Sequence, residues 1–143
     1  MLRLPNNPVQ KALYQKLKTY EELIGAPTYD FVPDEAKMPF ITLGNTVTSN
    51  IGNKTEDNTK IEVQINIWSE YKGKYQINNI AERIINLLMS QETGYLDCEA
   101  DGFAAYEQSI SAYEAYPEGD EGYNAVIGLE VHVKNLEATA DEI

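Results

Sequence analysis

The stretch KIEVQINIW, residues 60–68, decides the class of fold. Its apolar and polar side chains alternate strictly, with Ile61, Val63, Ile65 and Ile67 set against Glu62, Gln64, Asn66 and Trp68. Because successive side chains of a strand point to opposite faces of its sheet, this pattern predicts a β-strand. One face of that strand belongs to a core, and the other is exposed or covered by a partner.

Further strands are predicted on both sides of this stretch. Residues 123–133 alternate in the same way, and residues 103–115 form a strand whose buried face is ambiguous, with the turn PEGDEG at 117–122 between the two. Earlier in the chain, short strands are expected at Tyr29–Val32 and Phe40–Gly44, joined by a connection with two prolines. Polar and turn-forming residues dominate residues 44–60, which predicts a long hairpin loop.

Two amphipathic helices are predicted from apolar residues that recur every three or four positions. The first spans about 8–23, with Asn7 as its cap, Pro8 in its first turn and Gly25 after its end. The second spans about 75–90. Hairpin-length links between the strands favour a mostly antiparallel sheet of four to five strands. We therefore expect one α+β domain over residues 1–143, a two-layer sandwich with both helices on one face and an acidic, frayed tail from about 137.

Charge is strongly segregated along the chain. Residues 1–91 carry 10 Lys and Arg against 10 Asp and Glu, whereas residues 92–143 carry 1 against 13, so the formal charge of -12 arises in the last third. Nucleic-acid binding depends on Lys and Arg that displace counterions from phosphates, and no basic patch is present. No run approaches the roughly 20 apolar residues that span a bilayer, and residues 1–8 lack the apolar stretch of a signal peptide. We expect no membrane contact and a protein made in a cytoplasm.

The chain offers little to a catalytic or metal site. His132 is the only histidine, and the strand pattern directs it away from the core. Cys98 is the only cysteine, and the carboxylates beside it in LDCEAD should raise its pKa. No phosphate-binding or nucleophile motif occurs. We expect no catalytic residues, no cofactor and no metal, and we interpret Glu118, Asp120 and Glu121 as a solvated acidic turn rather than a calcium loop.

Aromatic residues are the better candidates for function. Trp68 should point to the uncovered face of the sheet, and it either covers the rim of its own subunit or anchors a protein contact. The acidic third also contains a group of tyrosines, Tyr106, Tyr113, Tyr116 and Tyr123. They suit a sheet surface or an interface, because the cationic groove that base stacking requires is missing from the sequence.

Two segments of the chain resemble the tail completion, or tail terminator, proteins of long-tailed bacteriophages and prophages. These are DFVPDEAKMPFITLG at 30–44 and, after the polar loop, IEVQINIWS at 61–69 followed by an amphipathic helix. The likeness covers nearly the whole chain, although position 40 is Phe where Tyr is expected.

The resemblance implies a structural protein of the virion, assembled in the host bacterial cytoplasm and placed at the tail–head junction. Such proteins form a ring, commonly a hexamer, that ends the tail tube and docks to a head-completion or connector protein. Subunit interfaces are expected on the polar loop and at the end of the central strand, at Asn50, Asn53, Lys54, Glu56, Asp57, Trp68 and Tyr71.

DNA would pass through such a ring without specific binding. An acidic surface is expected to face the DNA channel at Glu114, Glu118, Asp120 and Glu121, because like charges do not adhere. A bore lined by Lys11, Lys16 and Lys18 would refute this expectation. Two alternatives remain open: another neck component, such as a stopper or adaptor, and a small α+β regulatory domain with a ligand pocket between helices and sheet.

Overall fold

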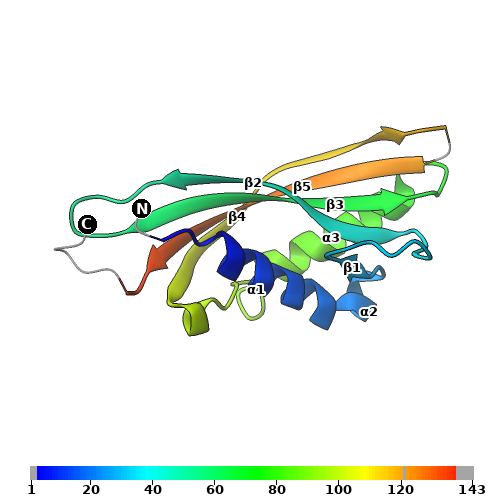
Figure 1. Ribbon diagram of the computed structural model, residues 1–143. Coiled ribbons are helices and arrows are strands. Elements are labelled where there is room, and N and C mark those ends of the chain that lie inside the picture. The colour runs from blue at the N-terminus through cyan, green and yellow to red at the C-terminus, as the bar shows by residue number, and fades with distance from the viewer. Residues whose placement is uncertain (1–2, 121, 138–143) are drawn as a thin grey trace.

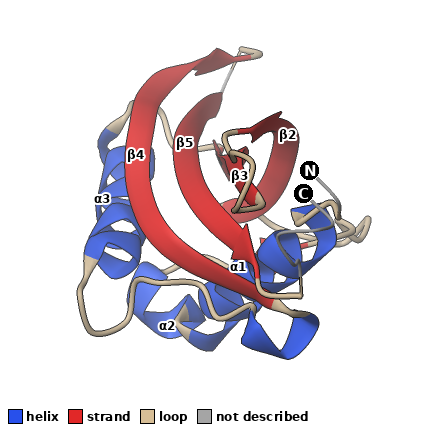
Figure 2. Cartoon of the chain, turned by 90° about the vertical axis from the view of Figure 1, so that its left-hand side faces the viewer, coloured by secondary structure: helices blue, strands red, loops and turns tan. Residues whose placement is uncertain are grey.

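Helices cover one face of a five-stranded sheet in the computed structural model, which describes residues 3–120 and 122–137 (Figure 1; Figure 2). The strands are β1 Thr28–Tyr29, β2 Phe40–Asn50, β3 Asn58–Ser69, β4 Phe103–Glu118 and β5 Gly122–Asn135. Their order across the sheet is β1-β2-β3-β5-β4. Only β1 and β2 pair in parallel; the other neighbours are antiparallel. The predicted α+β class and the mostly antiparallel sheet are confirmed.

The core lies between the central strands and the helices. On β3 the four apolar residues of the alternating stretch are fully buried, and each faces an apolar residue of β5, as in the pair Ile65 and Ile127. Burying one such side chain contributes about 1.5–3 kcal/mol, so this double row is the main stabilising element of the sheet. The polar residues of β3 lie on the opposite face, which none of the helices in residues 3–120 and 122–137 covers.

The two predicted helices pack on the same side of the sheet. Helix α1, Asn6–Thr19, contacts β1 and β2, and helix α3, Tyr75–Met89, contacts β3, β4 and β5. The short helices are α2, Glu21–Ile24, and the 3-10 turn η1, Glu99–Asp101. Gly25 follows α2 with a φ of 89°, the left-handed conformation that glycine adopts without strain.

The start of the first helix differs from the prediction. Asn7 is not the cap: α1 begins at Asn6 after Pro5, and no side chain caps it. Asn6 instead bonds to β2, accepting a hydrogen bond from Thr48 Oγ1 (2.8 Å) and donating one to Thr46 Oγ1 (3.4 Å). The asparagine therefore joins the helix to the sheet, a contact between residues some 40 positions apart that local sequence cannot specify.

The strand boundaries were predicted wrongly at three places. The strand expected at 29–32 ends at Tyr29, and Phe31 lies in the loop that follows. The long loop expected over 44–60 is short, because β2 continues to Asn50 and β3 begins at Asn58. Strand β4 continues through Pro117, which is tolerated near the end of an edge strand because no neighbour needs its missing N–H.

The molecule is elongated, and the loops that join neighbouring strands lie at its two ends (Figure 1). Strand β3 alone has 12 residues, a span of roughly 40 Å. One end holds the β2–β3 loop, residues 51–57, beside the C-terminal end of β5. The other end holds the loop 30–39, the β3–α3 connection and the turn between β4 and β5.

Candidate assembly surfaces

The seven residues expected at interfaces lie at both ends of the molecule. Asn50, Asn53, Lys54 and Glu56 are exposed at the β2–β3 loop, whereas Trp68 and Tyr71 lie at the far end of β3. The structure therefore does not bring them together as one surface, and their place in interfaces stays a prediction.

Two asparagines give the β2–β3 loop its shape. Asn53 Oδ1 accepts hydrogen bonds from the backbone N–H of Thr55 (2.8 Å) and of Glu56 (3.0 Å), and Asn50 Oδ1 accepts one from Gly52 N–H (3.0 Å). Asn side chains that bond to backbone two or three residues ahead are typical of ordered turns. The loop is thus ordered by its own side chains, and it presents Lys54 and Glu56 to solvent.

Asp57 has a different role from its neighbours, because only 2% of it is exposed. Asn135 Nδ2 donates to Asp57 Oδ2 (3.0 Å), and Asn135 N–H donates to the Asp57 carbonyl (2.9 Å). The guanidinium of Arg3 donates to Asn135 Oδ1 (3.1 Å) and lies 4.2 Å from the centre of the Phe103 ring. Asp57 therefore joins the loop to β5 within its own subunit, and its part in an interface stays a prediction.

At the opposite end, Trp68 is on the uncovered face of the sheet, as its position in the alternation predicts. Its Nε1–H donates to Thr42 Oγ1 (3.0 Å) on β2, so this half-buried ring packs across its own subunit. Ser69 Oγ donates to Gln76 Oε1 (2.6 Å) and accepts from Tyr71 N–H (3.0 Å). These bonds fix the connection between β3 and α3 and hold Tyr71 in an exposed position.

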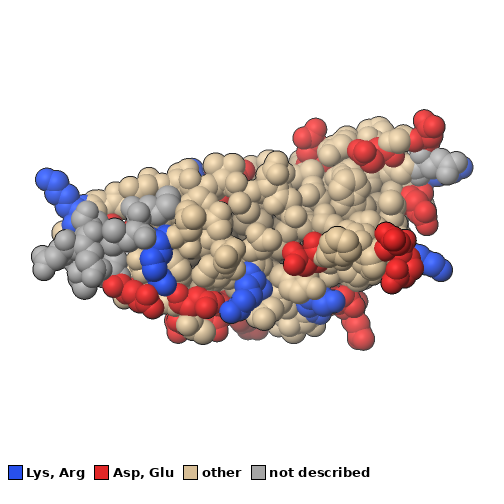
Figure 3. All heavy atoms as spheres, viewed as in Figure 1, with Lys and Arg blue, Asp and Glu red and all other residues tan. Residues whose placement is uncertain are grey.

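The acidic third divides into two parts in three dimensions. Near η1 its charges lie beside lysines of α1: Lys11 pairs with Asp101 at 3.1 Å, and Lys16 donates to the carbonyls of Thr93 and Tyr95. Burial lowers the pKa of Lys16, and nearby Asp97 opposes that shift. Glu114, Glu118 and Asp120 lie instead on β4 and its turn and are exposed, while Glu121 is outside the described residues. In Figure 3 acidic side chains predominate at this right-hand end.

The groups considered for catalysis are held in structural contacts. His132 lies on the uncovered face between Glu107 on β4, at 3.4 Å, and Glu130 on β5, at 3.2 Å. Cys98 is buried, and burial raises the pKa of its thiol to about 11, with further contributions from Asp97 and Asp101. The carboxylates considered in the sequence act in the expected direction but are not the main cause. Among residues 3–120 and 122–137, no three His, Cys, Asp or Glu side chains form a group that could hold a metal ion.

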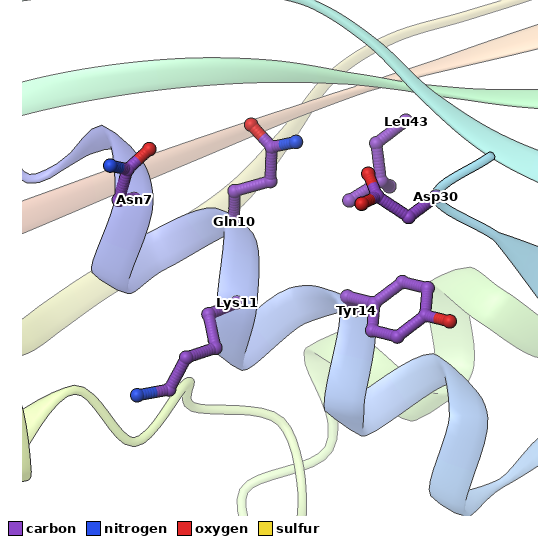
Figure 4. A pocket seen from close by; sticks show the side chains of 6 residues that line it. All are labelled: Asn7, Gln10, Lys11, Tyr14, Asp30 and Leu43. Carbon is purple, nitrogen blue, oxygen red and sulfur yellow. The ribbon is translucent and has the colours of Figure 1, made fainter.

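A hollow of about 410 Å³ lies between α1 and the β1–β2 edge (Figure 4). Its lining residues are Asn7, Gln10, Lys11, Tyr14, Asp30 and Leu43. The Lys11 side chain points away from Asp30 and Leu43. The polar residues of the lining are exposed or half-exposed, so no buried polar group faces the hollow to orient a small ligand.

Sequence reasoning missed several exposed apolar residues that the structure reveals. Phe31 is 86% exposed in the loop 30–39, Tyr75 is 71% exposed at the start of α3, and Val47 is 62% exposed on β2. Pro33 was the available signal for Phe31, since a proline two residues on disfavours a continuing strand. Val47 follows the Thr-Val-Thr alternation of an edge strand, which the surrounding Asn, Ser and Gly residues obscured.

Comparison with known proteins identifies the family of the chain. A family model described as tail completion protein gp17 matches residues 11–131. The chain belongs to this family. It is therefore a structural protein of phage tails. The match covers both major helices in large part and all five strands except the last residues of β5.

A solved structure with the same fold is a chain of the virion of a native gene transfer agent (GTA) particle. The two superpose with a TM-score of 0.74 at 18% sequence identity, over 88% of this chain and 94% of that one. At this identity the likeness establishes the fold alone. A search of curated protein sequences found no significant match. In the part of the chain that the structure describes, no helix is long and apolar enough to cross a membrane.

Proposed function

We propose that copies of this chain form a ring, a hexamer, that ends the tail tube and joins the tail to the head, without transforming a substrate. The observation that carries the proposal is the family match over residues 11–131. The occurrence of the same fold in a gene transfer agent virion supports a place in the particle.

At the two sides of the sheet, β2 and β4 offer two different edges for contacts between subunits. A ring forms when two different surfaces of each subunit meet head to tail. Among the described residues, β2 pairs only with β3 beyond Thr42, and β4 pairs only with β5, so both outer strands have a free edge. We propose that the β2 flank of one subunit meets the β4 flank of the next.

The acidic turn between β4 and β5 is our proposal for the surface that faces DNA. Glu114, Glu118 and Asp120 are exposed there, whereas Lys11 is paired with Asp101 and Lys16 is engaged with backbone carbonyls. A wall of negative charge repels the phosphates and lets DNA slide past.

The first test is the mass of the purified protein in solution, by sedimentation equilibrium, with negative-stain images of the same sample. The expected species has six times the 16.1 kDa of one chain. A monomer at every concentration, also after mixing with tails that lack this protein, would contradict ring formation. Binding to heads but not to tails would assign the chain to another neck component instead.

A further inference from the structure

Strands β2 and β4 each contain a run of six uncharged residues along a free edge. On β2 this is LGNTVT, residues 43–48, and on β4 it is QSISAY, residues 108–113; we call them the β2 run and the β4 run. Natural proteins protect the free edges of sheets with charged side chains, because unpaired N–H and C=O groups bind other strands. Neither run carries such a charge, so both are open to pairing.

The two runs lie at the same level of the sheet. One line of paired residues across the strands begins at Leu43 and ends at Tyr113, and a second begins at Thr48 and ends at Gln108. A rotation about an axis roughly parallel to the strands, without translation along it, therefore brings the β4 run of one copy beside the β2 run of the next. A contact without translation closes a ring, whereas a contact with translation produces an open filament.

The strand directions agree with such a contact. Three antiparallel pairings separate β2 from β4, so these two strands run in opposite directions within one copy. The same rotation preserves their directions, and the strands of neighbouring copies therefore meet antiparallel. Antiparallel pairing is slightly more stable per residue than parallel pairing.

Side chains on the helix side of the two runs also match. Leu43 lines the hollow of about 410 Å³ beside α1, where β1 ends at Tyr29 and leaves the edge of β2 unpaired. Tyr113 is 37% exposed on the same line, and its hydroxyl donates to Asn78 Oδ1 of α3 (2.6 Å). Pairing of the runs places this anchored ring of one copy beside Leu43 of the next. Aromatic and aliphatic side chains opposite one another stabilise neighbouring strands.

Pairing of two like edges does not fit a ring. Two β4 runs that meet antiparallel would bring Glu107 of one copy opposite Glu114 of the other, and like charges directly opposite destabilise paired strands. Two β2 runs would meet about a two-fold axis and close a dimer. Unlike edges avoid the repulsion, because residues 40–53 contain no Asp, Glu, Lys or Arg.

We propose that the β2 run of one copy pairs as an antiparallel strand with the β4 run of the next, so that one sheet continues around the ring. This inference rests on the proposed function, in which the two flanks meet. It assigns the contact to hydrogen bonds between the main chains of two named segments, and the partner is a second copy of this chain.

Disulfide cross-linking between copies tests the pairing. Val47→Cys is combined with Ser109→Cys, because both residues are exposed and lie on one line across the uncovered face. A second combination uses Ser111→Cys, since Ser111 bonds to Glu62 on that face. Within one copy β2 and β4 are three strand spacings apart, roughly 14 Å, which exceeds the reach of a disulfide. Mild oxidation should therefore link neighbouring copies, and denaturing gels without reductant should show a ladder at multiples of 16.1 kDa.

Matched controls separate this pairing from other contacts. Val47→Cys with Glu118→Cys places the second thiol nine residues further along β4 than Ser109, roughly 30 Å away, and should give no ladder. Each single variant retains the buried Cys98 and should run as one chain on the same gel. With reductant, all variants should keep the solution mass and the melting temperature of wild type.

Two results would overturn the inference. A wild-type ring whose Ser109 and Ser111 combinations give no ladder would show that other surfaces join the copies. A disulfide-linked dimer in a single variant would show that like edges pair. Wild-type protein that forms no ring, in solution or on tails, would instead contradict the proposed function, and the inference with it.

Discussion

Cys98 illustrates, at the scale of one residue, how the fold suppresses a reactive group. Its thiol is buried against α1, with Sγ 3.7 Å from the carbonyl of Pro8, and Asp97 and Asp101 lie nearby. Burial disfavours the thiolate first, and the two carboxylates add to the effect, so the pKa rises to about 11. The thiolate is the nucleophile, and the neutral thiol is inert.

Alkylation of Cys98 should therefore be slow in the folded protein. With a pKa near 11 instead of 9, the thiolate fraction at pH 8 falls about 100-fold, and burial slows the reagent further. Iodoacetamide labelling, followed by mass spectrometry, should be at least that much slower in native than in unfolded protein. The free energy of unfolding should also fall as pH rises above 9, because the folded state then holds more protons than the unfolded state. Equal labelling rates would contradict the buried placement.

At the scale of one element, β2 shows how an edge strand can be hidden in a polar sequence. Residues 45–50 are Asn, Thr, Val, Thr, Ser and Asn, and the turn-forming types among them favour a loop when they are judged locally. Pairing with β3 extends the strand to Asn50, since the well-patterned residues 59–63 provide a ladder to bind. No charged side chain protects this edge, the usual device against pairing with another chain.

A charge placed on this edge should weaken the ring. Val47→Asp puts a carboxylate on a 62% exposed position of β2, and the cost of removing this charge from water disfavours a neighbouring subunit at this flank. The facing Glu62 belongs to β3 of the same subunit, so its repulsion lowers the stability of the fold and not the affinity between subunits. Sedimentation velocity should show monomers at concentrations where wild type is assembled, while the unfolding free energy changes by about 1 kcal/mol or less. Gln15→Glu, an added carboxylate on the exposed side of α1, is the control and should keep wild-type mass. An intact ring in Val47→Asp would exclude the β2 flank from the subunit contact.

For the whole molecule, the total formal charge of -12 does not show which surface is negative; the distribution of the charged residues in the fold does. Lysines of α1 lie against the acidic segment near η1, so the sequence-level excess in the last third is partly balanced by the first. The uncompensated acids gather on β4 and its turn with β5, at one end of the long axis (Figure 3). That placement is the basis of our proposal that this acidic surface faces a channel for DNA.

Reversing these charges tests that link in assembled particles. The variant Glu114→Lys/Glu118→Lys/Asp120→Lys changes the formal charge from -12 to -6, two units at each of three positions. We expect joined particles with slower DNA ejection, measured by fluorescence of released DNA, because lysines bind the passing phosphates. A matched Gln variant at the same positions should have a smaller effect. Ejection at the wild-type rate in the Lys variant would show that this surface does not line the channel.

Patterns within a few residues fixed the central strands, both major helices and the one-sided cover of the sheet, because a period of two or of 3.6 residues is a local property. Gly25 was likewise predictable as the end of a helix, since a left-handed turn favours glycine. The same local chemistry identified Trp68 as a residue of the uncovered face and Cys98 as a poor nucleophile.

Contacts between distant segments decided the rest. Asn6 bonds to Thr48 of β2, Asp57 bonds to Asn135, and Lys11 forms an ion pair with Asp101. The two residues of each pair are separated by tens of positions in the sequence. The split of the expected interface between two ends of a long molecule, and the exposure of Phe31 in the loop 30–39, likewise follow from the assembled sheet. A side chain's neighbours in space depend on which strands pair and where they stop, and that outcome is a free-energy balance over the whole chain that no local pattern contains.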